Sequence, residues 1–334
     1  MIRGIFNWLS IFSFKSKLKK RNTEVETTPS VVWEQDSAKR ALDELFTLTC
    51  QYRNSKSYQE LLQFVTRFRF YSPFNAMLVH VQMRGAKFVA PPHRWLRDYG
   101  RRIKANARPL VILQPMGPVM FVFDVSDTEP TREARQLPPE VENPFEVRKG
   151  CIGQELERVI ENAKRDGIRI IQSQDGSQAA GSIGPVTKDV KSWLKFQTGV
   201  DKDRKPIFTD LPVRYDLLIN GKLSREAQYA TIVHELAHLY CGHLGTPNNK
   251  WWPDRHGLDY DVREFEAESV AYLVCSRCDI HNPSDQYLSG YVGEQRQVPS
   301  ISLDCVMKTA GLIETMSRQR MKPRKRSKED ANVG

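Results

Sequence analysis

The segment ATIVHELAHLYCGHLG, residues 230–245, constrains this chain more than any other. His234 and His238 are four residues apart, and side chains at that spacing share one face of an α-helix. Apolar residues cover most of the rest of the predicted helix: Ile232, Val233, Leu236, Ala237 and Leu239. Because polar side chains are costly to bury without partners, the two imidazoles need one. A metal ion bound by both histidines meets that need better than a histidine pair packed in a core or on a surface helix.

The spacing of the acidic residue suggests which metal chemistry this is. Zinc accepts imidazole nitrogen readily and keeps an open position when only three protein ligands bind it. Glu235 directly follows the first histidine, so it is poorly placed to bind the same ion but can act as a general base. A bound zinc ion lowers the pKa of a water ligand to about 7. The sequence therefore predicts one Zn²⁺ per chain and Glu235 as the catalytic residue.

A third ligand is expected from the segment REFEAESVAY, which follows on a second apolar helix. Glu264 and Glu268 are four residues apart and share a face, whereas Glu266 points about 200° away. We predict Glu264 as the ligand and Glu268 as an acceptor for a histidine N–H, with the two roles exchanged as the alternative. Glu266 is expected on a solvated face.

Other cysteines and histidines lie nearby in the sequence. Cys275 and Cys278 form a C-x-x-C that could join Cys241 and His243 in a separate structural zinc site, but we favour buried thiols. For His243 and His256 we expect solvated surface positions rather than a role in binding an oxyanion. The six cysteines are sparse and irregularly spaced, which is typical of a reducing compartment and predicts a cytoplasmic protein.

HELAHLYCGH followed by EFEAESVAYLVC resembles the ImmA/IrrE-type metallopeptidases, a gluzincin-like group. Glu264, Ala267, Glu268 and Ala271 match the second part of that pattern, E-x-x-A-[NDE]-x-x-A. The same pairing occurs in the C-terminal part of ArdC-type antirestriction proteins, and Glu268, where many ImmA/IrrE members have asparagine, favours the ArdC side. The resemblance implies a zincin-like fold over roughly residues 148–280. It also implies that RYDLLIN, residues 214–220, is an edge strand for an extended peptide substrate.

Residues 66–109 combine ten basic side chains and seven aromatic ones with a single acidic residue, Asp98. Basic side chains follow phosphates and aromatic rings stack on unpaired bases, although the same residues could be core and ordinary surface. The segment is similar to the N-terminal single-stranded DNA-binding domain of ArdC-type proteins, through Ser72, Asn75 and Leu78 and then Trp95 to Gly100. The resemblance implies single-stranded DNA as a partner. The candidate contacts are Arg84, Lys87, Arg94, Trp95, Arg97, Arg101, Arg102 and Lys104.

These patterns predict an α+β protein with an N-terminal α+β single-stranded DNA-binding domain and a zincin-like, gluzincin-type metallopeptidase domain. We expect a basic disordered lead-in at 1–30, the DNA-binding domain at 31–130, a Pro- and Glu-rich linker at 131–147, the peptidase domain at 148–315 and a basic disordered tail at 316–334. No apolar run reaches the ~20 residues that span a bilayer. The lead-in could make weak contact with an anionic membrane surface.

The expected function is zinc-dependent peptide hydrolysis coupled to single-stranded DNA binding. By resemblance, the setting is an antirestriction system of a mobile element. Two alternatives remain: a DNA-coating antirestriction protein whose zinc is structural, and a sensor peptidase that cleaves a repressor. All three readings include a zinc ion, and two of them include a protein or peptide substrate.

Overall fold

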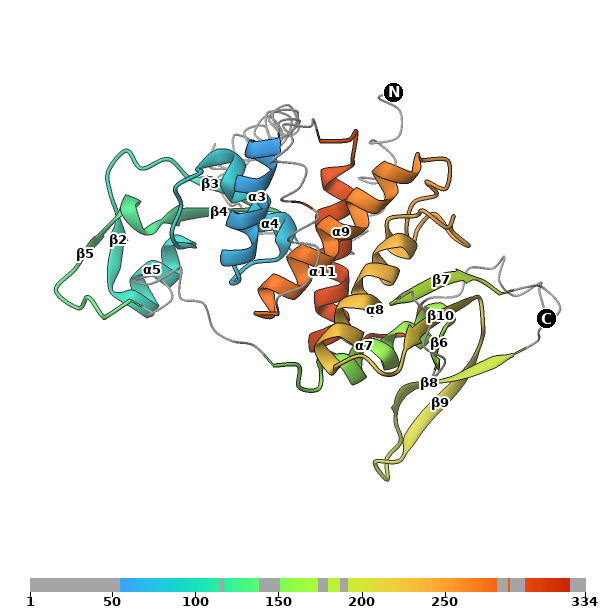
Figure 1. The fold of residues 1–334 in the computed structure, drawn as a ribbon. Coiled ribbons are helices and arrows are strands. Elements are labelled where there is room, and N and C mark those ends of the chain that lie inside the picture. Colours follow the sequence, from blue (N-terminus) through green and yellow to red (C-terminus); the bar gives the residue numbers. More distant parts are fainter. Residues whose placement is uncertain are drawn as a thin grey trace, which may run out of the picture.

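The computed structural model describes residues 55–114, 117–137, 151–173, 180–186, 192–280, 288 and 298–324, and it confirms a mixed α+β fold. The predicted lead-in, the first part of the predicted DNA-binding domain and most of the predicted linker lie outside these residues. The division into domains at 131–147 therefore stays a prediction. Figure 1 shows three central helices between an N-terminal part and a C-terminal sheet.

The described residues of the N-terminal part form two small sheets and three α-helices. In chain order it contains α3 (Ser55–Arg67), α4 (Pro73–Gln82), β1 (Val89–Ala90), α5 (Pro92–Tyr99), β2 (Arg101–Ile103), β3 (Leu110–Gln114), β4 (Gly117–Asp124), the 3₁₀ turn η3 (Val125–Asp127) and β5 (Thr128–Pro130). Strands β1, β4 and β3 form one antiparallel sheet in that order, and β2 pairs with β5.

The motif residues of this part have structural roles. The Ser72 hydroxyl caps α4 by accepting a hydrogen bond from the Asn75 amide, and Pro73 occupies the first turn. The Asn75 side-chain amide pairs with both the N–H and the C=O of Leu113, and Gln82 does the same with Val111. Two amides on α4 thus satisfy the outer edge of β3, which would otherwise leave its backbone groups without partners.

The C-terminal part supplies the sheet and the long helices. It contains α7 (Glu155–Ala163), the 3₁₀ turn η4 (Lys164–Asp166), β6 (Ile168–Ser173), β7 (Gly181–Pro185), β8 (Trp193–Val200), β9 (Pro206–Pro212), β10 (Tyr215–Asn220), α8 (Arg225–Tyr240), α9 (Tyr260–Arg277) and α11 (Leu303–Arg318). Strands β8 and β9 form a separate hairpin (Figure 1).

The order of the C-terminal sheet corrects one expectation. RYDLLIN forms β10, but β10 is the central strand, parallel to β6 and antiparallel to β7. Its alternate residues Tyr215, Leu217 and Ile219 are buried, as expected of a strand with a helix packed on one face. Among the described residues, β7 is an edge strand of this sheet, and it packs beside α8.

One hydrophobic core runs through both parts. Leu61 and Met77, from α3 and α4, belong to the same buried cluster as Leu236, Val270 and Met307 from the three long helices. Helices α3 and α4 thus bury their apolar faces partly on α9 and α11, next to which they lie in Figure 1. Consequently, the interior of the N-terminal part is completed by the C-terminal part.

A buried ion pair fixes this junction. The Arg277 guanidinium, at the end of α9, is bonded to the Glu314 carboxylate of α11 and donates to the backbone carbonyls of Val65, Phe68 and Tyr71. Arg277 is 3% exposed and Glu314 is 4% exposed. One side chain therefore neutralises a buried carboxylate and also satisfies carbonyls at and just beyond the C-terminal end of α3.

Replacing Arg277 with methionine should lower the free energy of unfolding by about 3–5 kcal/mol, since it leaves the Glu314 carboxylate buried without its main partner. Chemical denaturation of the full chain measures this. The control is Arg318→Met, which removes an exposed arginine 3.6 Å from the same carboxylate and should cost less than about 1 kcal/mol. Equal effects of the two variants would contradict this role of Arg277.

Residues 316–324, which were expected in a disordered tail, are ordered in the structure. Helix α11 continues to Arg318, and the residues after it are bonded to the body. The Met321 amide donates to Asn162, and the Arg324 guanidinium binds the fully buried carboxylate of Asp166. Residues 316–324 are thus part of the fold, because a buried aspartate requires a cationic partner. No disulfide joins the cysteines in the described part of the chain, and no helix there is long and apolar enough to cross a bilayer.

Candidate metal centre

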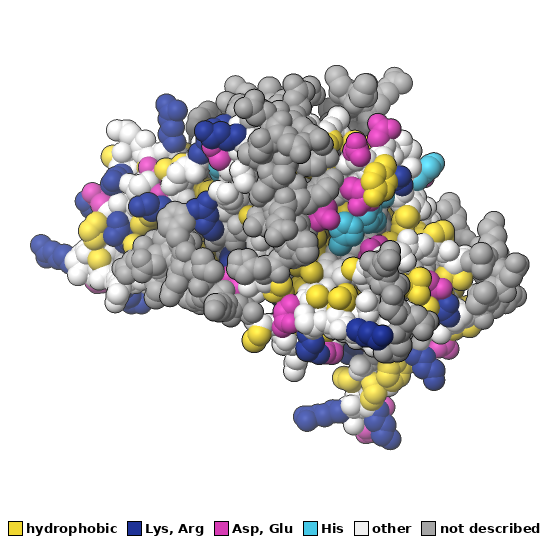
Figure 2. Space-filling model, in the orientation of Figure 1, with side chains coloured by type: hydrophobic (Ala, Val, Ile, Leu, Met, Phe, Trp, Pro, Cys, Tyr) yellow, Lys and Arg dark blue, Asp and Glu magenta, His cyan; other side chains and the backbone are white. Residues whose placement is uncertain are grey.

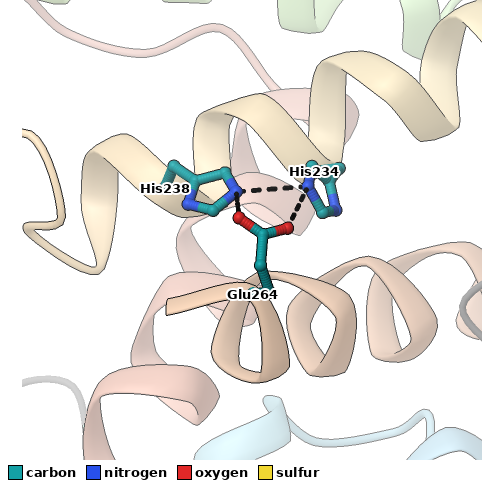
Figure 3. A group of neighbouring side chains, drawn as sticks. All are labelled: His234, His238 and Glu264. Carbon is teal, nitrogen blue, oxygen red and sulfur yellow. Dashed lines mark hydrogen bonds and ion pairs between the residues drawn. The ribbon is translucent and has the colours of Figure 1, made fainter. Parts of the chain in front are cut away.

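Helix α8 places both histidines of the motif on one face. Its N-cap is Ser224, whose hydroxyl accepts a hydrogen bond from the Ala227 amide. The helix ends at Tyr240, and Gly242 then turns the chain with a φ of 83°. A Cβ on Gly242 would lie 2.0 Å from the Pro253 carbonyl oxygen, so only glycine fits this turn. Helix α9 packs against α8 and brings its glutamates to the histidines (Figure 3).

His234, His238 and Glu264 form the candidate metal-binding group. Their donor atoms all lie within 4.8 Å of one another. The two Nε2 atoms are 3.2 Å apart, and the Glu264 carboxylate oxygens lie 3.7 Å from His234 Nε2 and 3.4 Å from His238 Nε2. The three side chains are 15–23% exposed. The group is therefore held by packed helices yet open to a substrate, and Figure 2 shows histidine and acidic side chains together on this face.

The chemistry of these donors fits zinc. Two imidazoles and one carboxylate are a ligand set of catalytic zinc sites, which leaves a fourth position open. A ligating histidine must be neutral. Burial, together with His234 and His243, lowers the pKa of His238 to about 3, so this imidazole is neutral at physiological pH. Burial also raises the pKa of Glu264, an effect that His234 partly offsets.

Glu264 and Glu268, on one face of α9, lie near different histidine ring nitrogens. Glu264 faces Nε2 of both histidines, whereas Glu268 Oε1 lies 3.5 Å from His234 Nδ1. Because the Nε2 atoms face each other, the arrangement favours Glu264 as a ligand and Glu268 as the acceptor for the other ring nitrogen of His234. This is the predicted assignment rather than its alternative.

Glu235 lies between the metal-binding group and the edge of the sheet. Burial and the nearby Glu264 raise the pKa of Glu235, while His234 and the Ile183 backbone amide lower it, with a net upward shift. Strand β7 comes close because Gly181 has no side chain: a Cβ there would lie 2.5 Å from Thr231 Cγ2 and 3.7 Å from Glu235 Cγ. The candidate base thus sits beside a backbone strand as well as beside the metal-binding group.

The open edge of β7 faces this base. The Asn220 amide donates to Ala180 and the Val186 amide donates to Arg214, so even-numbered residues of β7 pair with β10. Odd-numbered residues therefore direct their backbone groups away from the sheet, and Ile183 is the one whose amide meets Glu235. An extended chain laid along this edge would pass the metal-binding group.

Two expectations for the neighbouring residues were wrong. Glu266 is not solvated but fully buried, and His243 is 2% exposed rather than on the surface. Burial raises the pKa of Glu266, whereas hydrogen bonds from His243, Arg255 and the Ser302 amide lower it. The hydrogen bonds outweigh burial, so the net shift of this pKa is downward. His256 is exposed, as expected, and is bonded to Asp254.

Sequence reasoning missed this buried network because it treated α9 as having one polar side. Helix α9 is buried on more than one side, with Phe265, Ala267 and Val270 buried alongside Glu266. An acidic residue on a buried side of a helix requires a partner. The sequence signal for a buried Glu266 was Arg255, a cationic residue in the loop between α8 and α9.

The candidate DNA contacts are spread over the surface of the N-terminal part, where Lys and Arg side chains are common (Figure 2). Six of the predicted residues are exposed: Arg84, Lys87, Arg94, Arg97, Arg102 and Lys104. Arg101 is half-buried and donates to Thr128. Three of these arginines form ion pairs. Arg94 and Arg97 share the carboxylate of Asp98, and Arg102 pairs with Glu129.

Trp95 is the clear exception among these candidates. Its ring is 0% exposed, packs edge-on against Phe88 and donates from Nε1 to the Phe123 carbonyl. A buried ring cannot stack on a base, so Trp95 is a core residue and its prediction as a contact was wrong. The glycine that follows in the motif, Gly100, ends α5 with a φ of 59°, and a Cβ there would lie 2.1 Å from the Glu133 carbonyl oxygen.

Comparison with known proteins finds a similar solved structure and a matching domain family. One solved structure similar to the chain is the metal-free crystal structure of the antirestriction ArdC protein from plasmid R388, with 12% sequence identity, a TM-score of 0.33 and coverage of 75% of this chain and 86% of that chain. No curated protein is similar enough to count as a match. Residues 194–282, which include the metal-binding group and Glu235, match the IrrE N-terminal-like domain of the peptidase M78 family. The HELAH and EFEAE motifs both lie within this matching segment.

Proposed function

We propose that this protein is a zinc-dependent peptidase that cleaves an extended peptide segment bound along β7. The observation that carries the proposal is the placement of Glu235, buried beside the His234–His238–Glu264 group and in contact with the open edge of β7. The match to a peptidase domain over the same residues supports it.

Each residue has a distinct part in the proposed reaction. His234, His238 and Glu264 would hold the ion, which would polarise the scissile carbonyl and activate a water. Glu235 takes a proton from the attacking water and passes it to the leaving amine. Its raised pKa suits a group that must first accept a proton and then donate it. The edge of β7 orients the peptide through main-chain hydrogen bonds, which do not depend on the side chains of the substrate.

Single-stranded DNA binding by the N-terminal part is the second proposed function. Exposed basic side chains there, together with the Phe70 ring of the same part, which is 53% exposed, favour a flexible polyanion with unpaired bases. An antirestriction role would join the two activities on incoming DNA. Of the two alternatives, a coat protein with a structural zinc needs no catalysis, whereas a repressor-cleaving sensor needs the same peptidase chemistry on a different substrate.

Charge reversal tests the DNA proposal. Arg84→Glu with Lys87→Glu, in the full chain, should weaken binding of a single-stranded oligonucleotide and lower the salt slope by about 1.4, since each phosphate contact contributes ~0.7 on single strands. Fluorescence anisotropy at several salt concentrations measures both quantities. The full chain is needed because α3 and α4 complete their packing on α9 and α11.

The control carries the same charge change on another surface. Lys202→Glu with Lys205→Glu alters exposed residues at the turn of the β8–β9 hairpin, at the opposite end of the molecule from β2 and β5 (Figure 1). If both double variants lower the affinity equally, binding follows net charge alone and the proposed surface is wrong. If neither changes it, the N-terminal part is not the binding surface.

A further inference from the structure

We propose that His243 is a positioning residue for the metal centre, which connects the ligand His238 to the buried carboxylate of Glu266 and fixes the orientation and tautomer of that ligand. The inference rests on the proposed metal site and names a residue outside the three ligands and the base. Its basis is a continuous row of buried hydrogen bonds from α8 through the following turn to α9.

The row begins at the ring nitrogen of His238 that faces away from the ligands. His238 Nδ1 lies 3.0 Å from His243 Nδ1, and His243 Nε2 lies 2.9 Å from Glu266 Oε2. His243 thus uses both ring nitrogens. Its side chain is 1% exposed, and that of Glu266 is 0% exposed, so water does not compete for either contact.

The far end of the row determines where each proton lies. The Arg255 guanidinium binds both Glu266 oxygens at 2.6 Å, and the Ser302 amide donates to Oε1 at 2.7 Å. These donors keep Glu266 an anion, which can only accept, so His243 carries its proton on Nε2. His243 Nδ1 is then an acceptor, His238 must donate from its own Nδ1, and its Nε2 is left with a lone pair.

That unprotonated nitrogen is the one that faces the other ligands. His238 Nε2 lies 3.2 Å from His234 Nε2 and 3.4 Å from Glu264 (Figure 3). The opposite tautomer would direct an N–H at the ion and lose the bond to His243. The ring is therefore held in the binding orientation before the ion arrives, which reduces the cost of ordering the site.

The same residues do not form a second metal site. Cys241, His243 and Glu266 lie close enough together to hold an ion. However, Glu266 already accepts hydrogen bonds from Arg255, Ser302 and His243, and a cation there would lie beside the guanidinium. Every polar atom of this cluster needed for ligation has a protein partner, which suits a hydrogen-bonded support.

Zinc affinity of the full chain, measured by competition with a chromophoric chelator, tests the inference without using activity. His243→Phe keeps a ring but removes both nitrogens, and it should weaken zinc binding by about 10–100-fold. His243→Gln can accept from His238 and donate to Glu266 at the same time, so its affinity should return to within a few fold of wild type. The control is His256→Phe, at an exposed histidine, which should change nothing.

A second pair of variants covers the case in which His243→Phe does not fold. His243→Asn carries the same amide as glutamine one methylene shorter and cannot span both partners, so it should bind zinc more weakly than His243→Gln. The visible spectrum of the Co²⁺-substituted protein should also differ between the two, since it reports ligand geometry. Equal affinities and spectra for asparagine and glutamine would overturn the inference.

Metal analysis separates the possible failures. If wild-type protein binds no zinc, the proposed metal site itself fails. If wild type binds one zinc with high affinity and His243→Phe binds it equally well, the metal site stands and the role of His243 is lost. Two zinc ions per chain in wild type, falling to one in His243→Gln, would show a second ligand site instead and contradict the positioning role.

Discussion

The variant Glu235→Gln should retain one zinc ion per chain and lose peptidase activity by about 10²–10⁴-fold, the range that general acid–base catalysis contributes. Glutamine has nearly the same shape and can keep a contact with the Ile183 amide, but it cannot take a proton. The loss should appear in kcat rather than in KM, since the base acts in the transition state. A fluorogenic peptide library supplies a substrate for the measurement.

The control for this variant is an acidic residue on the neighbouring helix. Asp261→Asn changes an exposed carboxylate in the first turn of α9, one turn before Glu264, and should keep full activity. A Glu235→Gln protein that is inactive on peptides yet fully protective in an antirestriction assay would favour the coating alternative. If that variant cleaves peptides at the wild-type rate, Glu235 is not the base.

The metal-binding group could be predicted from sequence because its geometry is local. The spacing of His234 and His238 sets one face of α8, and the spacing of Glu264 and Glu268 sets one face of α9. Polar faces on two buried helices are less costly when they face each other. The pairing of α8 with α9 could therefore be predicted without knowledge of the loop between them. Both patterns lie within residues 194–282, the segment that matches the IrrE N-terminal-like domain.

Features that depend on distant contacts could not be predicted in this way. Alternation in RYDLLIN indicated a strand, but its central position depends on which strands add to each side, at β6 and β7. The aromatic character of Trp95 suggested stacking on bases, whereas its burial follows from the position of Phe88 and Phe123 in the fold. The burial of Glu266 and His243 could not be predicted either. Glu266 is bonded to Arg255, in the loop between α8 and α9, and to the backbone amide of Ser302, which is distant in sequence.

The second large expected effect is the loss of zinc affinity when the third ligand, Glu264, is removed. Glu264→Ala should lower zinc affinity well beyond the roughly 10–100-fold that loss of a partner of a ligand costs, because it removes a coordinating oxygen. Glu268→Ala should fall within that 10–100-fold range, since Glu268 faces only Nδ1 of His234. Chelator competition on the two purified variants, with metal content measured after gel filtration, compares them directly.

The contrast between these two variants is what decides the assignment. Both residues lie on the same face of α9 and have similar exposure, so removing either should affect folding alike. A larger loss of zinc affinity for Glu268→Ala than for Glu264→Ala would exchange the two roles. Glu268 would then be the carboxylate ligand, with His234 as its nearest histidine. Full zinc content in both would mean that the histidines alone hold the ion. The distances favour the first outcome, because only Glu264 approaches Nε2 of both histidines.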